Sequence, residues 1–441
     1  MGGLLTALVL LLIAAAPAWG SEATITAEKS LGPRVVELTI STPAFTAPTH
    51  VDVDLPNGYE LEPQRRWPVA YFLAGTQNTY ASFNSVVDGV GLTESFPAIV
   101  VSPNGNSGYW SDWYNGGKFG PPEYETYVVE QLIPLIDERF RTLGDRAHRA
   151  IAGVSMGGYG AMMIAARHPD LFADAASISG ADDSNVPELG AAVSLSSTFD
   201  GGAIDAIYGP RLTQEVRWRG HNPTDLAANL RGLDLQVRTA NGILDPGIGE
   251  ELLSADTVSC LVEAAVFQGS TSFSAKLDKL GIAHLWKNYG PGCHSPQNFE
   301  REIADTLTVF TEEFADPPAA PSSFDYESIE PSFDIWGWHV AADPKRALEF
   351  MRLENVGDEG MTIEGSGTTT VTSPPLFRHA HVVHLTGATT PTATPDAAGR
   401  ITFQVDLGPP DRVQQYRLGA DPAEVTKVVT YSRHRPAARV P

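Results

Sequence analysis

"RAIAGVSMGGYGAMMIAARHPDLF", residues 149–172, passes from a short apolar segment through a glycine-rich turn into a helical pattern. The turn has the form G-x-S-x-G, with Ser155 between Gly153 and Gly157. A serine at such a sharp strand-to-helix turn, a nucleophile elbow, is held in a strained conformation that exposes its hydroxyl group. The stretch therefore predicts a strand, an elbow with Ser155 as a nucleophile, and a helix.

Strand and helix patterns alternate on both sides of this elbow. Strand-like runs include RVVELTIST, RRWPVAYFLAG and DAASISG, and helical runs include EYETYVVEQLIPLIDERF and the region from about 258 to 280. Alternation of this kind is typical of an α/β fold with a mostly parallel central sheet and helices on both faces. We expect this domain to span residues 21–316.

The sequence changes character after the last of these helices. Residues 317–332 are rich in proline and serine, which predicts a linker. Residues 333–441 contain short β-patterned runs separated by Gly, Pro and Asp. They predict a small all-β, sandwich-like accessory domain.

The amino terminus has the pattern of a secretory signal. Residues 1–20, MGGLLTALVLLLIAAAPAWG, contain an apolar run followed by Ala18 and Gly20 before a cleavage point. The two cysteines of the chain, Cys260 and Cys293, suggest one disulfide in an exported protein. The sequence thus predicts a protein that is secreted to the extracellular space or the cell envelope.

The charge of the chain argues against nucleic acid as a partner. The 441 residues carry a formal net charge of −23, and the acidic residues are spread along the sequence. A surface of this kind repels phosphate backbones. We therefore expect neither nucleic acid nor another anionic polymer as a partner.

A nucleophilic serine needs a base and donors for the oxyanion it generates. His294, on the glycine- and proline-rich loop in WKNYGPGCHSPQNF, is the best candidate base, since the expected chain order is serine, acid, histidine. His221 and His284 fit structural positions better. The predicted oxyanion donors are the N–H groups of Met156 and of Thr76, with Gly75 as an alternative to Thr76.

Three carboxylates compete as the triad acid. Asp245 follows a strand directly before the histidine region, and spacing alone favours it; Asp182 follows an earlier strand. Glu263 lies one helical turn after Cys260, and Cys293 is adjacent to His294, so a disulfide would place Glu263 beside the base. The spacing and the cysteines leave Glu263 and Asp245 open.

Several stretches together resemble the esterase D / antigen 85 group of α/β-hydrolases. They are RRWPVAYFLAGTQNTYASF, YWSDWYNGG, AGVSMGGYGAMMIAARHPDLF and NYGPGCHSPQNF, and the likeness covers about residues 45–315. The stretch LVEAAVFQGSTSFSAKLDKLGI is most similar to antigen 85, in which the catalytic acid is a glutamate on the helix before the histidine loop. The resemblance thus implies an α/β-hydrolase fold and favours Glu263 over Asp245.

The resemblance also bears on activity. It implies a serine esterase that uses Ser155, His294 and Glu263 on a small-molecule or lipid ester, with neither a metal nor an organic cofactor. A mycolyltransferase-like enzyme that moves an acyl chain to a sugar or alcohol acceptor is the alternative. Ala74-Gly75-Thr76-Gln77 replaces the Asp-Gly-Leu-Arg run of the mycolyltransferases, which argues against transfer to trehalose. A non-catalytic envelope- or matrix-binding protein on a hydrolase scaffold is the third expectation.

Overall fold

A computed structural model describes residues 23–115, 122–251, 256–422 and 424–433. The expected signal segment, residues 1–20, lies outside the described residues. Within the described ranges, no helix is both long enough and apolar enough to cross a membrane.

The described helices and strands follow one another in chain order, with α-helices, strands and shorter π or 3₁₀ turns (η) numbered separately. They are β1 (Thr24–Ser30), β2 (Val35–Ser41), β3 (Thr49–Asp54), β4 (Val69–Leu73), α1 (Ser82–Val86), α2 (Gly89–Leu92), β5 (Ile99–Pro103), α4 (Tyr124–Thr126), η1 (Tyr127–Leu132), α5 (Ile133–Arg139), η2 (Arg146–His148), β6 (Arg149–Val154), α6 (Met156–Arg167), β7 (Asp174–Ile178), α7 (Pro187–Ser196), η3 (Ser197–Asp200), α8 (Arg211–Arg219), η4 (Ala227–Leu230), β8 (Asp234–Thr239), η5 (Pro246–Ile248), α9 (Asp256–Leu280), β9 (Leu285–Asn288), α10 (Pro296–Glu313), β10 (Phe324–Ser328), β11 (Ser332–Ile335), β12 (Trp338–Ala341), β13 (Met351–Val356), β14 (Gly360–Gly365), β15 (Thr368–Thr372), β16 (Val383–Thr386), β17 (Thr392–Ala393), β18 (Thr402–Asp406) and β19 (Val425–Ser432).

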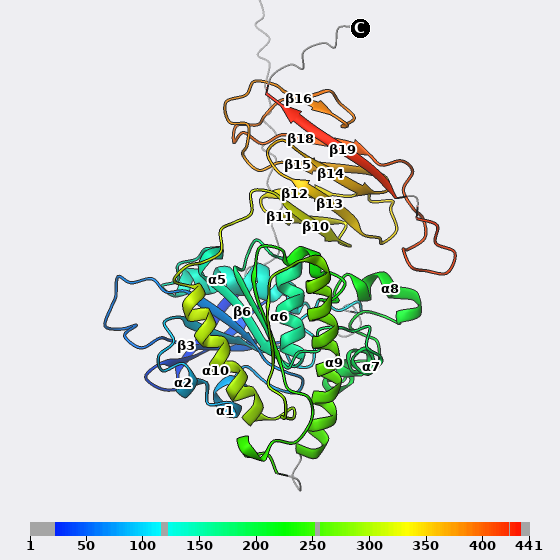
Figure 1. Cartoon of the computed structure of the whole chain (residues 1–441). Helices are drawn as coiled ribbons and strands as arrows, with labels where there is room; N and C mark the ends of the chain where they lie inside the picture. The colour runs from blue at the N-terminus through cyan, green and yellow to red at the C-terminus, as the bar shows by residue number, and fades with distance from the viewer. Residues whose placement is uncertain (1–22, 116–121, 252–255, 423, 434–441) are drawn as a thin grey trace, which may run out of the picture.

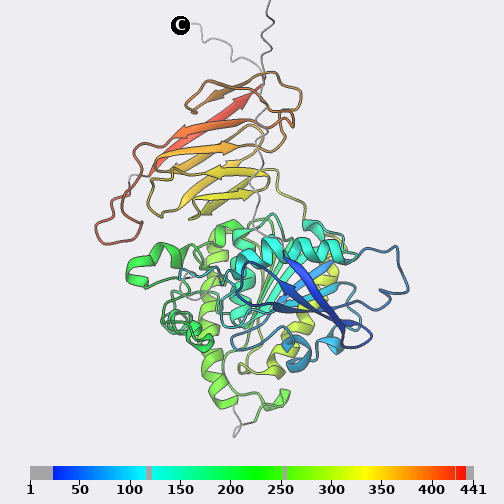
Figure 2. The ribbon, with the colours of Figure 1, turned by 180° about the vertical axis from the view of Figure 1, so that it is seen from behind.

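The described part of the chain contains a nine-stranded mixed sheet in the order β1-β2-β3-β5-β4-β6-β7-β8-β9 (Figures 1 and 2). The strands from β5 to β9 are parallel, whereas β1, β2 and β3 join the sheet through antiparallel pairs. The strand patterns quoted from the sequence begin at Arg34 and omit β1, whose side chains are nearly all exposed. The sheet confirms the α/β class.

Helices cover both faces of this sheet. On one face, α6 and the segment from η1 to α5 pack against strand residues such as Tyr71, Val101 and Ile151. On the other face, α10 and residues around α1 pack against Phe72, Val100 and Ala152. The central strands are buried on both faces, and their sequences are therefore nearly continuous apolar runs.

The carboxyl-terminal strands form two separate antiparallel sheets, one of six strands and one of four among the described residues. Side chains of both sheets meet in one apolar cluster, which includes Leu353, Ile363, Val371 and Phe403. The prediction of a linker over residues 317–332 is wrong in part, because strand β10 lies within that range. Tyr326 and Ser328 of β10 point inward with a period of two, a short strand signal that the surrounding prolines and serines obscured.

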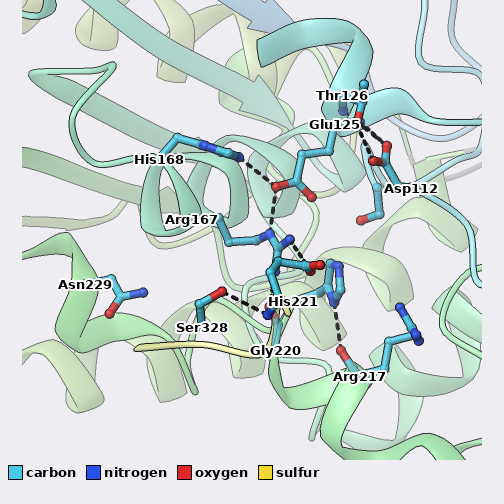
Figure 3. A network of polar contacts seen from close by, with 12 residues as sticks. Asp112, Glu125, Thr126, Arg167, His168, Arg217, Gly220, His221, Asn229 and Ser328 are labelled. Carbon is cyan, nitrogen blue, oxygen red and sulfur yellow. Dashed lines mark hydrogen bonds and ion pairs between the residues drawn. The ribbon is translucent and has the colours of Figure 1, made fainter. Parts of the chain in front are cut away.

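These two sheets contact the α/β unit at the amino-terminal edge of its parallel strands (Figure 1). The Tyr326 hydroxyl donates a hydrogen bond to the carbonyl of Arg167, the last residue of α6, and the Trp336 backbone N–H donates to the Asp170 carboxylate just after that helix. Arg167 also pairs with Glu125 and with Glu330, at 2.7 and 2.8 Å, in a buried ionic cluster (Figure 3). Since α6 begins directly after Ser155, this contact lies at the sheet edge opposite that serine.

Candidate active site

Ser155 lies between β6 and α6, where the backbone turns sharply. Its dihedral angles are φ 59° and ψ −120°, a conformation that side-chain-bearing residues rarely adopt. The surrounding structure holds it there, because the Ser155 N–H donates to the Ile178 carbonyl at 2.9 Å and its own carbonyl accepts from Tyr159. The serine is half-buried at the carboxyl edge of the sheet.

The glycines of the elbow leave room for neighbouring backbone. A Cβ atom on Gly157 would lie 1.9 Å from the carbonyl oxygen of Leu73 on β4, and one on Gly153 would lie 2.3 Å from Gly157. Any larger residue at these positions would push β4 away from the turn. The close approach explains why glycines flank the serine on both sides.

His294 pairs with Glu263. The two residues come from the loop before α10 and from α9, and the His294 Nδ1 lies 2.7 Å from the Glu263 Oε2. Glu263 has no exposed surface, and its Oε1 accepts hydrogen bonds from the Ala240 N–H and the Ser179 hydroxyl at 2.8 Å each. These bonds hold Glu263 as a buried acceptor, so the imidazole donates from Nδ1 and keeps the lone pair of Nε2 for a proton.

The structure brings neither of the other candidate acids to His294. Asp245 accepts from the Gly247 N–H and pairs with Arg301 at 3.4 Å. Asp182 accepts from the Ser177 hydroxyl at 2.7 and 2.8 Å, and burial raises its pKa to about 7. The spacing of residues in the sequence favoured Asp245. In the structure, however, α9 places Glu263 next to Ala240 at the end of β8 and next to His294, whereas Asp245 contacts Gly247 and Arg301.

The two other candidate histidines have structural surroundings. His221 is buried, its Nδ1 lies 2.8 Å from the Arg217 carbonyl, and burial with the charge of Arg167 lowers its pKa to about 4 (Figure 3). The His284 Nε2 lies 2.7 Å from the Ser274 hydroxyl oxygen. Neither contacts Ser155 in the described part of the chain.

The histidine loop is held in place by a disulfide and by a glutamate. Cys260 and Cys293 form the expected disulfide, which joins α9 to the residue before His294. Glu250, which the sequence did not single out, accepts from the Cys293 N–H at 2.8 Å and the Ser295 hydroxyl at 2.6 Å. These two contacts span 43 and 45 positions, so no local pattern could have indicated them.

The expected oxyanion donors, Met156 and Thr76, belong to two segments that adjoin Ser155. Met156 is the first residue of α6, so its N–H has no partner within the helix. Thr76 lies in the loop after β4, and a Cβ on the preceding Gly75 would be 3.3 Å from the Ser155 Cβ. Among the described residues no hydrogen bond joins Ser155 to His294, whose Nε2 is buried without a partner.

One carboxylate cluster could hold a metal ion in the described part of the chain. Asp174, Asp234 and Glu313 offer oxygen atoms within 4.8 Å of one another. They lie where β7 and β8 begin and α10 ends, at the sheet edge opposite Ser155. Burial, with the charges of Asp234 and Glu313, raises the pKa of Asp174 to about 8. A proton on Asp174 would reduce the negative charge of this cluster.

A mostly parallel sheet with a strained serine between a central strand and a helix, together with a buried glutamate that pairs with a histidine, is typical of the α/β-hydrolase class. A family model described as "Putative esterase" matches residues 42–310, and the chain belongs to this family. The match confirms the relationship to esterases that the sequence motifs suggest.

Individual relatives agree with this family. The chain is 31% identical over 240 residues to Esterase Rv1288 of Mycobacterium tuberculosis, covering 53% of this chain and 50% of the relative. It is 30% identical over 135 residues to diacylglycerol acyltransferase/mycolyltransferase Ag85B of Mycobacterium avium, covering 29% and 39% of the two chains. The chain thus spans about half the length, or less, of these relatives.

A solved structure shares the fold. The crystal structure of Mycobacterium tuberculosis MPT51 superposes with a TM-score of 0.51 and 19% identity, covering 63% of this chain and 97% of that one. At this level of identity the likeness extends to the fold alone.

Proposed function

We propose that this chain is an exported serine esterase that hydrolyses carboxylic esters through an acyl-enzyme on Ser155. Ser155 Oγ attacks the ester carbonyl carbon while the His294 Nε2 takes the hydroxyl proton. The N–H groups of Thr76 and Met156 donate hydrogen bonds to the resulting oxyanion. His294 then gives its proton to the alcohol oxygen as the C–O bond breaks, which leaves the acyl group on Ser155.

Water completes the reaction. His294 takes a proton from the attacking water, the second oxyanion collapses, and the proton returns to Ser155 Oγ as the carboxylic acid leaves. Glu263 accepts the Nδ1 hydrogen bond throughout and stabilises the imidazolium in both halves. Neither half requires a metal or an organic cofactor.

The pairing of His294 with Glu263 is the observation that supports this proposal most strongly. The carboxylate is fully buried, and it lies 2.7 Å from Nδ1. A histidine bound in this way presents Nε2 as a base, and within the described ranges Nε2 has no competing partner. The strained elbow at Ser155 supplies the matching nucleophile.

Hydrolysis of p-nitrophenyl acetate, butyrate and palmitate by the purified chain tests the proposal. We expect Ser155→Ala to lower kcat/KM by at least about 10³-fold, because the variant has no nucleophile. Ser85→Ala, which removes an exposed hydroxyl on α1, is the matched control and should leave kcat/KM unchanged. Equal rates in the wild type and Ser155→Ala would overturn the serine mechanism.

Acyl transfer is the second candidate function, favoured by the similarity to the acyltransferase Ag85B. An acyltransferase would form a new ester when glycerol or trehalose is added, which mass spectrometry of the products would detect. A folded chain that neither hydrolyses esters nor transfers acyl groups would contradict both enzymatic proposals and support a binding protein.

Apolar side chains beside the histidine loop support an apolar substrate. Val258 and Leu261 on α9 are 69% and 74% exposed, and they flank Cys260 of the disulfide. Ile243 is 60% exposed, and its backbone pairs with Gly292, two residues before His294. We expect these side chains to contact the acyl or alcohol part of a lipid ester.

The domain organisation and the export of the chain are part of the same proposal. We propose a catalytic domain over residues 21–316 and an accessory β-sandwich domain that begins at β10. The accessory sheets have their own apolar cluster, and they contact the edge opposite Ser155, so we expect them not to contact the reacting ester. The leader pattern of residues 1–20 and the disulfide support export.

A further inference from the structure

A second buried carboxyl group lies behind Glu263. Glu302, on α10, has no exposed surface, and its Oε2 lies 3.1 Å from the Ser179 Oγ. The same hydroxyl oxygen lies 2.8 Å from the Glu263 Oε1. Ser179 therefore bridges the two glutamates, directly behind the residue that pairs with His294.

The number of hydrogens available between Ser179 and the two glutamates indicates that Glu302 carries a proton. A serine hydroxyl has one hydrogen, so Ser179 can donate to only one of the two carboxyl groups. Glu263 accepts from the Ala240 N–H and from His294, so it is the ionised partner and takes the Ser179 hydrogen. The contact between Ser179 and Glu302 is then a hydrogen bond only if Glu302 is protonated and donates it.

Asn298 and Arg301 fix the other end of Glu302. The Arg301 Nε–H donates to the Asn298 Oδ1 at 2.8 Å, which sets the orientation of the amide. The Asn298 Nδ2 then faces the Glu302 Oε1 at 3.1 Å and the Ser179 Oγ at 3.3 Å. One Glu302 oxygen thus accepts a hydrogen bond, and the other is free to carry the proton.

The charges around Glu302 agree with a neutral acid. Burial, together with the charge of Glu263 on α9, raises the pKa of Glu302 well above its usual range. Arg301 on the same helix opposes this shift but does not cancel it. Ser179 after β7 and Asn298 are neutral, so among the described residues Glu263 and Arg301 are the charged groups that act on Glu302.

We propose that Glu302 is a positioning residue that stays protonated and donates to Ser179, so that Ser179 orients Glu263 as the single negative charge facing His294. An ionised Glu302 would draw the Ser179 hydrogen away from Glu263 and place a second negative charge behind it. This inference rests on the proposed serine-hydrolase function.

Glu302→Gln and Glu302→Leu test the two parts of this role. Glutamine can donate from its amide to Ser179 and accept from Asn298, as the neutral acid does, so kcat/KM should stay within about 3-fold. The midpoint of the acid limb of its kcat/KM–pH profile should also not move. Leucine removes the donor, and we expect kcat to fall about 3- to 10-fold with KM unchanged.

Two outcomes would overturn the proposal. A downward move of the acid limb by about 1 pH unit in Glu302→Gln would mean that Glu302 carries a negative charge in the wild type. A Glu302→Leu variant with wild-type kcat would mean that the hydrogen bond does not position Glu263. Glu300→Gln, a half-buried glutamate on the same helix, is the matched control, and it should leave the rate and the profile unchanged.

A second readout separates this inference from the proposed function. The imidazole titration of His294 can be followed by NMR, with the signal assigned by its loss in His294→Gln. If no ester is turned over, the proposed function fails, but an unchanged titration in folded Glu302→Gln would still support a neutral Glu302. If Ser155→Ala abolishes hydrolysis and the titration moves in Glu302→Gln, only the assignment of Glu302 fails.

Discussion

Two buried carboxylate clusters in the α/β unit balance their charge in different ways. At Glu125, the Arg167 Nε and the His168 Nε2 lie 2.7 and 2.8 Å from one carboxylate oxygen (Figure 3). At Glu263, the neighbouring carboxyl is Glu302, and the titratable partner is His294. The Glu125 carboxylate binds a permanent cation directly, whereas the Glu263 carboxylate has a cationic partner only when His294 is protonated.

This difference decides how much charge each cluster keeps. Burial alone would raise the pKa of Glu125, but Arg167 and His168 hold it well below its usual range. Burial and the charge of Glu263 instead raise the pKa of Glu302 well above its usual range. The Arg167 cluster is suited to join the α/β unit to Glu330, while the Glu263 cluster is suited to stabilise a transient imidazolium.

The largest expected effect comes from removing the charge of Glu263. Glu263→Gln should lower kcat by about 10³–10⁴-fold, because the amide neither stabilises the imidazolium nor fixes the Nδ1 tautomer. Steady-state kinetics on p-nitrophenyl butyrate measure this loss. Asp245→Asn is the control that separates the two candidate acids, and it should keep kcat within about 3-fold. The opposite result would make Asp245 the catalytic acid.

Breaking the other cluster should affect stability and leave catalysis intact. Arg167→Met leaves the buried Glu125 carboxylate without its guanidinium, and we expect a loss of about 3–5 kcal/mol in the free energy of unfolding. Urea denaturation measures this loss. Activity per folded molecule should not change, because the cluster lies at the sheet edge opposite Ser155.

An exposed ion pair provides the contrast for Arg167→Met. Glu62 pairs with Arg65 at the surface, where their side chains are 49% and 45% exposed. Glu62→Gln should therefore cost less than about 1 kcal/mol. A similar small cost for Arg167→Met would show that the buried cluster does not stabilise the fold.

The Glu263 cluster has a covalent tether, whereas the Arg167 cluster has an ion pair. The Cys260–Cys293 disulfide closes a separation of 33 residues between the helix of Glu263 and the loop of His294. Replacing both cysteines with serine should lower the free energy of unfolding by about 2–4 kcal/mol. It should also lower kcat, because the Glu263–His294 geometry loosens. Unfolding midpoints and kcat that match the wild type would contradict the tether.

The two clusters also differ in how far the sequence predicts them. The elbow at Ser155 and the loop of His294 are local patterns, and the cysteine positions with the family resemblance favoured Glu263 over Asp245. Ser179 reaches Glu263 and Glu302 across 84 and 123 positions, and Arg167 reaches Glu330 across 163. Contacts of such separation depend on which strands and helices become neighbours, which no local pattern specifies.

A third carboxylate cluster, formed by Asp174, Asp234 and Glu313, has no role in the proposed reaction. The charge of Arg146 opposes the rise in the pKa of Asp174 but does not cancel it. Asp174 is 1% exposed, and among the described residues neither of its carboxyl oxygens has a hydrogen-bond partner. Burial, with the charges of Asp234 and Glu313, raises its pKa from the ordinary 3.8 to about 8, so the folded state binds more protons than the unfolded state between those pH values. Its contribution to stability is therefore present at acidic pH and is lost as the pH rises toward 8.

Asp174→Asn should abolish this loss, because an amide stays neutral and can donate to Asp234 and Glu313. At pH 9 we expect the variant to be more stable than the wild type by about 1–3 kcal/mol, and below pH 4 the two should be equal. Thermal melts from pH 4 to 9 measure the difference, in the presence of EDTA and again with added calcium. Stabilisation of the wild type by calcium, lost in Asp174→Asn, would mean that a cation instead of shared protons balances the cluster. A variant less stable than the wild type at pH 9 in EDTA would mean that the ionised carboxylate is already compensated, as Glu125 is by Arg167.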